Sequence, residues 1–232
     1  LGGLMVPGEG ILCTFTLPLA LATEAVVNGV DLKLNHRVEA VSQADGLHVL
    51  QTSAGPVTCR FLVNAAGLYS DAIDRMLGHD DFTVTPRRGE LIVFDKFARP
   101  LVNHVLLPVP TSITKGVLIS PTVFGNVMLG PTAEDLKDKT DTSTSAKGLD
   151  MLWQKGKAIL PRLLDEEVTA TYAGLRAATQ HSDYQIRLHG EQRYVCVGGI
   201  RSTGVSACLG ISEYVVGLLG EAGLALSEKA TY

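Results

Sequence analysis

The chain has 232 residues, of which 46% are hydrophobic and 19% charged, and its formal net charge is −4. This length allows one large domain or two small ones with a substantial core, and the composition excludes an intrinsically disordered chain. This net charge does not favour nucleic acid or an anionic membrane surface as a partner. A few local arginines can still bind a small anion. No apolar run approaches the length of a transmembrane segment.

In chain order, the first predicted element is a helix over 16–28, where apolar residues recur at helical spacing before an Asn-Gly stop. Three strands are predicted next, at 31–42, 46–53 and 57–66, with connections short enough for hairpins. The later half of the third strand is continuously apolar or small. This pattern predicts a strand covered on both faces, as in a parallel sheet.

From 78 to 131 the sequence is divided by Pro and Gly into strand-like pieces, which predicts an antiparallel sheet. A helix is predicted at about 145–160, before Pro161. Two more strands follow, and the apolar piece "RYVCVGGI" leads through "RSTG" into a final helix at 204–220. The pattern predicts an α/β (α+β) fold, in which one domain is interrupted by an antiparallel insert.

The four cysteines, Cys13, Cys59, Cys196 and Cys208, show neither C-x-x-C spacing nor a histidine at metal-ligand spacing. We therefore expect no metal site, and we interpret them as buried free thiols of a protein in a reducing compartment. The expected location is the cytoplasm, either free or peripheral to a membrane. The chain begins with Leu1 rather than Met, so we also expect it to be a piece of a longer protein.

The common nucleotide and hydrolase motifs are absent. The nearest approach to G-x-G-x-x-G, starting at Gly8, lacks the third glycine and follows no strand. The segment "GIRSTGVS" has the glycine spacing of a phosphate loop, but Val205 stands where the lysine must be, which argues against an NTPase. Ser202 is not part of G-x-S-x-G, because Ile200 occupies the first glycine position.

Two strand-to-helix turns remain, "VNAAGLYSDAI" (63–73) and "VCVGGIRSTGVSA" (195–207). In open α/β sheets, ligands bind beyond the carboxyl ends of the strands. After the first strand-to-helix turn, Ser70 is expected to cap the helix that follows. Asp71 and Asp74 place negative charge at the N-terminal end of that helix. Because these carboxylates would repel a pyrophosphate, the first turn is expected to flank a cofactor rather than to hold its phosphates.

The helix after the second strand-to-helix turn has no acidic residue at its N-terminal end. Its free N–H groups and the positive end of its dipole can therefore face an electron-rich ligand. The alternative for both turns is that small residues at strand ends serve packing alone.

Five segments in order resemble flavoproteins of the D-amino-acid-oxidase-like superfamily: "FLVNAAGLYSDAI", "PRRGELIVFD", "KGVLISPTVFGNVMLGPTAED", "YAGLRAAT" and "VGGIRSTGVSA". The glycerol-3-phosphate dehydrogenase-like and 2-hydroxyglutarate dehydrogenase-like branch is the most similar. The resemblance implies an incomplete FAD-binding Rossmann-like domain, 1–77 and 191–232, with an inserted antiparallel-sheet substrate domain, 78–190. The family's opening strand, glycine-rich turn and helix, which grip the ADP half of FAD, are expected upstream of Leu1.

The resemblance also implies cofactor contacts. Val38 is expected near the adenine through its backbone, and small residues of the first turn are expected beside the phosphate and ribose, namely Ala65, Ala66 and Gly67. The residues expected around the N1/C2-carbonyl edge of the isoalloxazine are Gly199, Ile200, Ser202, Thr203, Gly204 and Val205. Negative charge that develops near N1 suits a helix N-terminus.

Arg176, in "AGLRAAT", is implied as the substrate residue, because paired guanidinium donors can fix a carboxylate or phosphate bidentately. The alternative is a structural ion pair with Glu166, Glu167 or Asp183.

His104 is a candidate for the group that accepts the hydroxyl proton while hydride leaves, with a packed or surface histidine as the alternative. Arg201 and Lys115 are further candidates for substrate binding, and Arg87 and Arg88 for positive potential. Surface placement is the alternative for all four.

The sequence therefore predicts the C-terminal portion of an FAD-dependent dehydrogenase or oxidase. Its expected reaction is oxidation of a small anionic hydroxy compound, such as glycerol 3-phosphate, by hydride transfer to flavin N5. The alternatives are a 2-hydroxy acid such as 2-hydroxyglutarate as substrate, or a non-catalytic fragment without bound flavin. FAD is expected in the full-length protein, and the electron acceptor is expected to be a quinone, oxygen or a partner protein.

Overall fold

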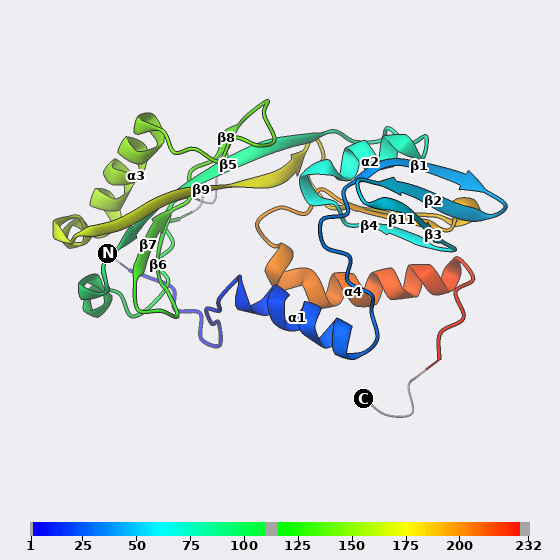
Figure 1. Cartoon of the computed structure of the whole chain (residues 1–232). Coiled ribbons are helices and arrows are strands. Elements are labelled where there is room, and N and C mark those ends of the chain that lie inside the picture. The colour runs from blue at the N-terminus through cyan, green and yellow to red at the C-terminus, as the bar shows by residue number, and fades with distance from the viewer. Residues whose placement is uncertain (1, 110–115, 228–232) are drawn as a thin grey trace. The chain divides into compact units, whose positions relative to one another are not determined.

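The computed structural model describes residues 2–109 and 116–227, which form two compact units from interleaved stretches of chain (Figure 1). Unit 1 contains Leu1–Thr23, Arg88–Glu134 and Thr142–Gly174, and unit 2 contains Glu24–Arg87, Asp135–Asp141 and Leu175–Tyr232. Two long strands, β5 (Val84–Phe94) and β9 (Val168–Thr179), pair with each other and each contributes residues to both units. The expected domain limits at 77/78 and 190/191 stay a prediction.

The core of unit 1 lies between an antiparallel sheet and one helix. Strand β7 (Val127–Gly130) pairs antiparallel with β5 and with β6 (Leu118–Pro121), which confirms the antiparallel middle of the chain. Ser145 caps the N-terminus of helix α3 (Ala146–Ile159), and its Oγ accepts a hydrogen bond from the Gly148 N–H at 3.0 Å. The buried apolar residues of this core include Ile92, Phe94, Ile119, Leu129 and Leu152.

The remaining elements around this unit are short. They are η2 (Lys96–Leu101) and η3 (Pro161–Asp165), together with β8 (Glu134–Asp135), which pairs with β5 and spans the boundary between the units. Helix α1 (Thr16–Val27) lies where the sequence predicts a helix, and none of its residues is buried.

Unit 2 contains an antiparallel meander of β1 (Val38–Ala44), β2 (Leu47–Thr52) and β3 (Gly55–Cys59). Both hairpins are confirmed, but two strand limits are wrong. The first strand begins only at Val38, and the strand expected over 57–66 is divided into β3 and β4 (Leu62–Asn64). The two halves pair with different sheets, so the chain has to turn between them.

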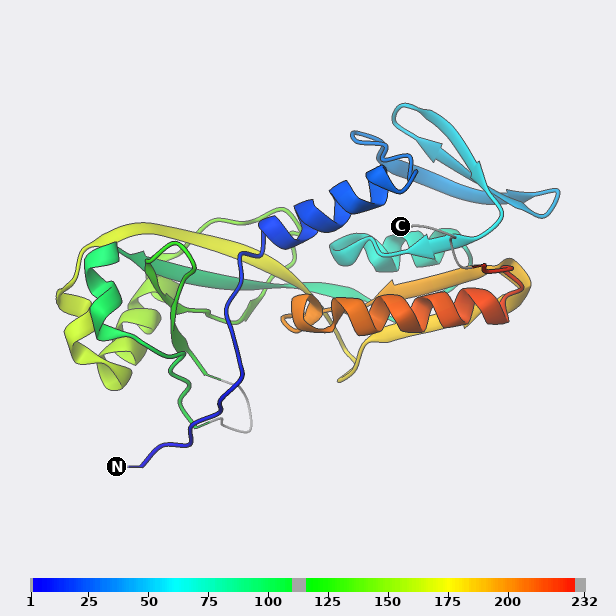
Figure 2. The same cartoon turned by 90° about the horizontal axis from the view of Figure 1, so that it is seen from below.

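The second sheet of unit 2 has the order β10-β11-β4 and contains the parallel pair that the sequence predicts. Strand β10 (Gln185–His189) is followed by η4 (Gly190–Gln192), and β11 (Tyr194–Gly198) is buried along its whole length. Helix α4 (Gly204–Glu221) lies alongside β11 and buries Val215 and Leu218 against it (Figure 2). Strand β4 is less covered than expected, because Val63 is 39% exposed.

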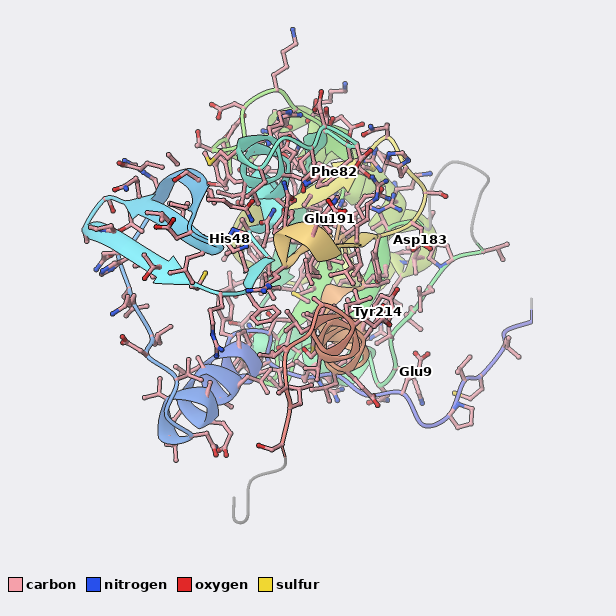
Figure 3. The ribbon with its side chains drawn as sticks, turned by 90° about the vertical axis from the view of Figure 1, so that its right-hand side faces the viewer. Glu9, His48, Phe82, Asp183, Glu191 and Tyr214 are labelled. Atoms are coloured by element: carbon pink, nitrogen blue, oxygen red, sulfur yellow. The ribbon has the colours of Figure 1, made fainter. Side chains whose placement is uncertain are left out.

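Two further features concern buried side chains. Phe82, Tyr194 and Cys196 belong to a core cluster of unit 2 that is separate from the one under α4. His48, on β2, is 1% exposed; Figure 3 labels Phe82 and His48. The cysteines are free, but only Cys196 is buried, and the other three are partly exposed. The expectation of buried thiols is therefore wrong for Cys13, Cys59 and Cys208. Within the two described ranges, no helix has both the length and the apolar character needed to cross a bilayer.

Two histidines of unit 2 stack on each other at the end of β10. The ring centroids of His79 and His189 are 3.6 Å apart with an interplanar angle of 23°, and Tyr194 lies 5.3 Å from the His189 ring. Burial lowers the pKa of His189 from its ordinary 6.5, and the charges of His79 and Arg187 lower it further. The charges of Asp74 and Asp81 raise the pKa, but by less.

The lowered pKa predicts a loss of stability in acid. The unfolded chain binds a proton at His189 more readily than the folded chain, so the stabilisation is complete above pH 6.5 and is lost as the pH falls through the folded pKa. We expect His189→Phe, which keeps a stacked ring but cannot titrate, to lose less unfolding free energy than the wild type between about pH 7.5 and about pH 5.5. Urea unfolding measures this, with His36→Phe as the matched control; equal pH dependence of all three proteins would contradict the assignment.

Candidate functional site

Both strand-to-helix turns of unit 2 leave the same edge of one sheet. Strands β4 and β11 are parallel neighbours, with Cys196 opposite Asn64, so their carboxyl ends lie side by side. Gly198 then packs closely on Phe82 and on the Ser70 side chain of the first turn: a Cβ at this position would lie 2.5 Å from Phe82 Cζ and 3.2 Å from Ser70 Oγ. Only a glycine fits such a contact. The structure therefore brings the two turns together, as expected of a ligand site in an open α/β sheet.

The first turn is held from behind by buried polar groups. It runs from β4 through η1 (Gly67–Tyr69) into α2 (Ser70–Met76). The Asn64 Oδ1 accepts the Ala66 N–H at 3.2 Å, and the Asn64 amide nitrogen donates to the Ser70 carbonyl at 2.8 Å. Gly67 has φ +55°, a conformation that favours glycine, and a Cβ there would meet nothing within 4 Å. The outer side of this turn is consequently open to a ligand.

A cavity of about 530 Å³ lies beside this turn, within the range of about 300–1,000 Å³ that is usual for small-molecule sites. Three of the predicted cofactor residues line it, namely Val38, Ala65 and Ala66, whereas Gly67 is outside the lining. The other lining residues were not identified from the sequence: Arg37, Leu50, Leu62, Val63, Asn64, Tyr69, Ala72, Ile73 and Met76. Most of them are ordinary apolar residues whose convergence depends on how β1, β2, β4 and α2 are arranged.

Two expectations for the start of α2 are wrong. Ser70 is the first residue of the helix rather than its cap, and its Oγ donates to the Gly67 carbonyl at 2.8 Å. Asp71 and Asp74 are each 2% exposed, so their charges do not face a ligand. Asp74 accepts the Tyr194 hydroxyl at 2.8 Å, inside the core. Repulsion from these two carboxylates is therefore not the reason why the turn could flank a cofactor.

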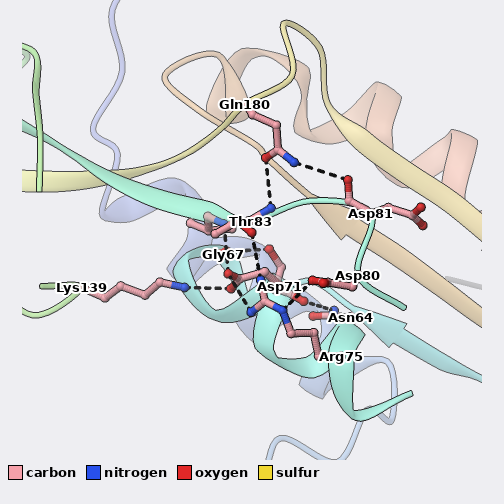
Figure 4. Close-up of polar contacts among 11 residues, drawn as sticks. Asn64, Gly67, Asp71, Arg75, Asp80, Asp81, Thr83, Lys139 and Gln180 are labelled. Atoms are coloured by element: carbon pink, nitrogen blue, oxygen red, sulfur yellow. Dashed lines mark hydrogen bonds and ion pairs between the residues drawn. The ribbon is translucent and has the colours of Figure 1, made fainter. Parts of the chain in front are cut away.

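Asp71 is the centre of a network that crosses unit 2 (Figure 4). Its Oδ1 lies 2.8 Å from Lys139 Nζ, and its Oδ2 accepts the Val84 N–H at 3.0 Å and lies 3.3 Å from Arg75 Nη1. Burial alone would raise the pKa of Asp71, but the Lys139 and Val84 hydrogen bonds and the charges of Lys139 and Arg75 outweigh it, so the pKa is lowered. The carboxylate is therefore charged and fully engaged within the protein.

The second turn presents a helix end without acidic side chains. Gly199 has φ +66°, and a Cβ on Gly204 would lie 2.7 Å from Ile200 Cγ2, so both positions favour glycine. The first turn of α4 contains no acid, and no side chain caps it. The Thr203 hydroxyl instead bonds to the Tyr184 hydroxyl. The positive end of the α4 dipole can therefore face an electron-rich group.

The predicted substrate residue Arg176 is half-buried on β9. Burial lowers its pKa, and so does the positive charge of Arg87 on the neighbouring strand β5. Arg87 is itself fixed by Asp135, with Nε–Oδ1 and Nη2–Oδ2 distances of 2.6 and 2.9 Å. Two guanidinium groups within unit 2 thus contribute to the local positive potential, and Asp135 fixes that of Arg87.

The other residues predicted for catalysis or substrate binding are His104, Arg201 and Lys115. His104 is exposed in unit 1, where it lines a second cavity of about 580 Å³ with Glu9, Arg99 and Asn103. The Arg201 guanidinium donates to the Ser182 carbonyl, and Lys115 lies outside the described residues.

Arg88 is not at the surface. It is 6% exposed and donates to Glu134 at 2.6 Å and to the Ser143 carbonyl at 3.0 Å. Its environment indicates a structural role in unit 1, beside the start of α3.

The residues of the two turns fit a flavin nucleotide. Small side chains and the open space at Gly67 allow close approach to the first turn, and the acid-free end of α4 suits the electron-rich edge of an isoalloxazine. No described side chain of the cavity lining carries a negative charge that would repel phosphates.

Comparison with known proteins agrees with this geometry. The family model described as FAD dependent oxidoreductase matches residues 1–218. A glycerol 3-phosphate dehydrogenase from Caloramator mitchellensis is 33% identical over 232 residues, which is 100% of this chain and 48% of that protein. An L-2-hydroxyglutarate dehydrogenase from Salmonella houtenae is 30% identical over 137 residues, which is 57% of this chain and 32% of that protein.

Among solved structures, the dithionite-reduced L-alpha-glycerophosphate oxidase from Mycoplasma pneumoniae with FAD bound matches with a TM-score of 0.82 and 32% identity. The match covers 91% of this chain and 56% of that one. This chain thus spans about half the length of the glycerol 3-phosphate relatives that it matches. With nearly all of its length matched by one family model, the chain belongs to the family of FAD-dependent oxidoreductases.

Proposed function

We propose that this chain contributes one wall of the flavin site and the anion-binding residue of an enzyme that oxidises glycerol 3-phosphate. The observation that carries the substrate class is the half-buried Arg176 beside a second guanidinium, that of Arg87. The similarity to a glycerol 3-phosphate dehydrogenase and an L-alpha-glycerophosphate oxidase supports the phosphate as the anion.

The cofactor would be held by the two turns at the edge of the β10-β11-β4 sheet. Val38, Ala65 and Ala66 would hold its adenosine and phosphate portion in the cavity of unit 2. The turn that contains Gly199 and Gly204 would hold the isoalloxazine, with the dipole of α4 directed at the N1 edge. When bound, the flavin supplies a hydride acceptor, N5, for the secondary alcohol carbon.

Arg176 would bind and orient the substrate anion. A guanidinium offers two parallel donors to a phosphate, which fixes the direction of the carbon skeleton as well as its position. Partial burial strengthens this attraction, because fewer water molecules screen it. Arg87 adds positive potential from the neighbouring strand while Asp135 keeps it in place. That His104, a residue of unit 1, accepts the hydroxyl proton as the alcohol becomes a ketone stays a prediction.

A 2-hydroxy acid is the second candidate substrate. The L-2-hydroxyglutarate dehydrogenase match covers 57% of this chain, and a guanidinium can bind a carboxylate bidentately as well as a phosphate. The electron acceptor is a quinone, oxygen or a partner protein. A cytoplasmic location, free or at a membrane surface, also stays a prediction.

The first test replaces the substrate residue in the FAD-loaded protein. Arg176→Lys keeps the charge but loses the paired donors. Loss of a charged hydrogen bond is worth about 1.5–3 kcal/mol, so we expect KM for glycerol 3-phosphate to rise roughly 10- to 150-fold with a much smaller change in kcat. Steady-state kinetics with glycerol 3-phosphate and with 2-hydroxyglutarate measure both the effect and the preferred substrate.

The control is Arg60→Lys, since Arg60 is an exposed arginine before β4. It should leave KM unchanged. If Arg176→Lys behaves like this control with every substrate turned over, Arg176 is not the anion-binding residue. Turnover of 2-hydroxyglutarate alone would replace glycerol 3-phosphate as the substrate.

The second test fills the cavity of unit 2. Ala66 is exposed on the outer side of the first turn, so Ala66→Leu should leave the fold intact while it occupies cofactor space. Overpacking costs about 1–3 kcal/mol, and we therefore expect roughly 5- to 150-fold weaker FAD binding in a flavin fluorescence titration. Ala54→Leu, at an exposed hairpin turn, is the control. A chain that stays colourless after FAD is added would contradict cofactor binding altogether and favour a non-catalytic fragment.

A further inference from the structure

A short stretch of chain, residues 135–141, interrupts unit 1 in the sequence but belongs to unit 2. We name it the strap. Its first residues are tied to β5: the Leu136 N–H donates to the Pro86 carbonyl at 2.8 Å, and the Asp135 carboxylate binds Arg87. The strap therefore reaches the first turn from an anchored start, and it brings Lys139 there.

Lys139 is the principal cationic partner of the buried Asp71 carboxylate. The Nζ–Oδ1 distance is 2.8 Å, and the Lys139 side chain is only 22% exposed (Figure 4). Arg75 is a weaker partner, since it lies at 3.3 Å and also binds Asp80 at 2.8 Å. A buried carboxylate that loses its main partner is strongly destabilised. The N-terminal end of α2 is therefore held in place by a side chain that comes from the strap.

The same ammonium group contacts the cavity wall. Lys139 Nζ lies 5.5 Å from the centroid of the Tyr69 ring, a geometry that suits a cation–π contact. Tyr69 lines the 530 Å³ cavity together with Ala65 and Ala66, and it immediately precedes α2. Lys139 thus holds both the helix that follows Tyr69, through Asp71, and the Tyr69 ring itself.

We propose that Lys139 is a positioning residue for the cofactor cavity, acting through Asp71 and Tyr69 without touching the cofactor. The inference rests on the proposed function, in which this cavity takes part of FAD. It extends that function to the strap, whose two ion pairs join the wall of the cofactor cavity to Arg87, the neighbour of the proposed anion-binding residue.

The experiment compares three single variants of the chain by FAD fluorescence titration. Lys139→Met keeps the aliphatic stem and loses the charge, and we expect about tenfold weaker FAD binding or more. Lys139→Arg restores the ion pair and should bind nearly as tightly as the wild type. Lys137→Met, at an exposed position of the same strap, should also match the wild type. Equal affinity of Lys139→Met and Lys137→Met would overturn the inference.

A second readout needs no cofactor. In a pH titration followed by NMR, Lys139→Met should raise the pKa of Asp71, because the largest hydrogen-bond contribution that lowers it is removed. An unchanged Asp71 titration would contradict the role of this ion pair.

A further variant covers a failure of Lys139→Met to fold. The double variant Asp71→Asn with Lys139→Met leaves no buried charge without its partner, so it should fold and still bind FAD weakly. A double variant that binds FAD as tightly as the wild type would contradict the proposal. If the wild-type chain itself binds no FAD, the proposed cofactor site and this inference both fall, whereas tight binding by wild type and Lys139→Met alike removes only the inference.

Discussion

The parallel pairing of β4 with β11 is the constraint on which the arrangement of unit 2 depends. Leu62 lies opposite Tyr194 and Asn64 opposite Cys196, so both strands end at the same edge of the sheet. Parallel strands require coverage on their faces, and β11 has it, with α4 on one side and the core around Phe82 on the other. Once this pair is formed, the two turns have to meet, and Gly198 is the residue that lets them do so.

Buried polar groups then decide which side of the first turn stays open. Asn64, Asp71 and Asp74 each have partners within the protein, from the backbone, Lys139 or the Tyr194 hydroxyl. Their hydrogen bonds fix the turn from its inner side, because an unsatisfied buried polar group is costly. What remains on the outer side is small and apolar. The character of the cavity thus results from polar groups that do not line it, apart from Asn64.

Local signals in the sequence predicted much of this fold, whereas long-range contacts escaped it. Caps, turns and periodicity predict helix α3 and the hairpins of β1–β3. Small residues predict both strand-to-helix turns. The burial of Asp71 was missed because its partner Lys139 lies far along the chain, in a polar stretch without a pattern. The proximity of Arg87 to Arg176 likewise depends on the pairing of β5 with β9, which no local pattern shows. The break between β3 and β4 was hidden by a continuous run of strand-forming residues.

The interleaved path of the chain has a consequence for the order in which it can fold. The meander of β1–β3 uses only local contacts and can form while the chain is still being synthesised. Strand β4, in contrast, has to wait for β11, near the C-terminal end, and the intervening residues build most of unit 1 in the meantime. Until then β4 has no strand to pair with, and the apolar residues of β4 and α2 can pack only on the β1–β3 meander. High contact order of this kind slows folding and prolongs the exposure of an unpaired strand, so the same strand pair that creates the cofactor edge also makes this edge the last part of unit 2 to be completed.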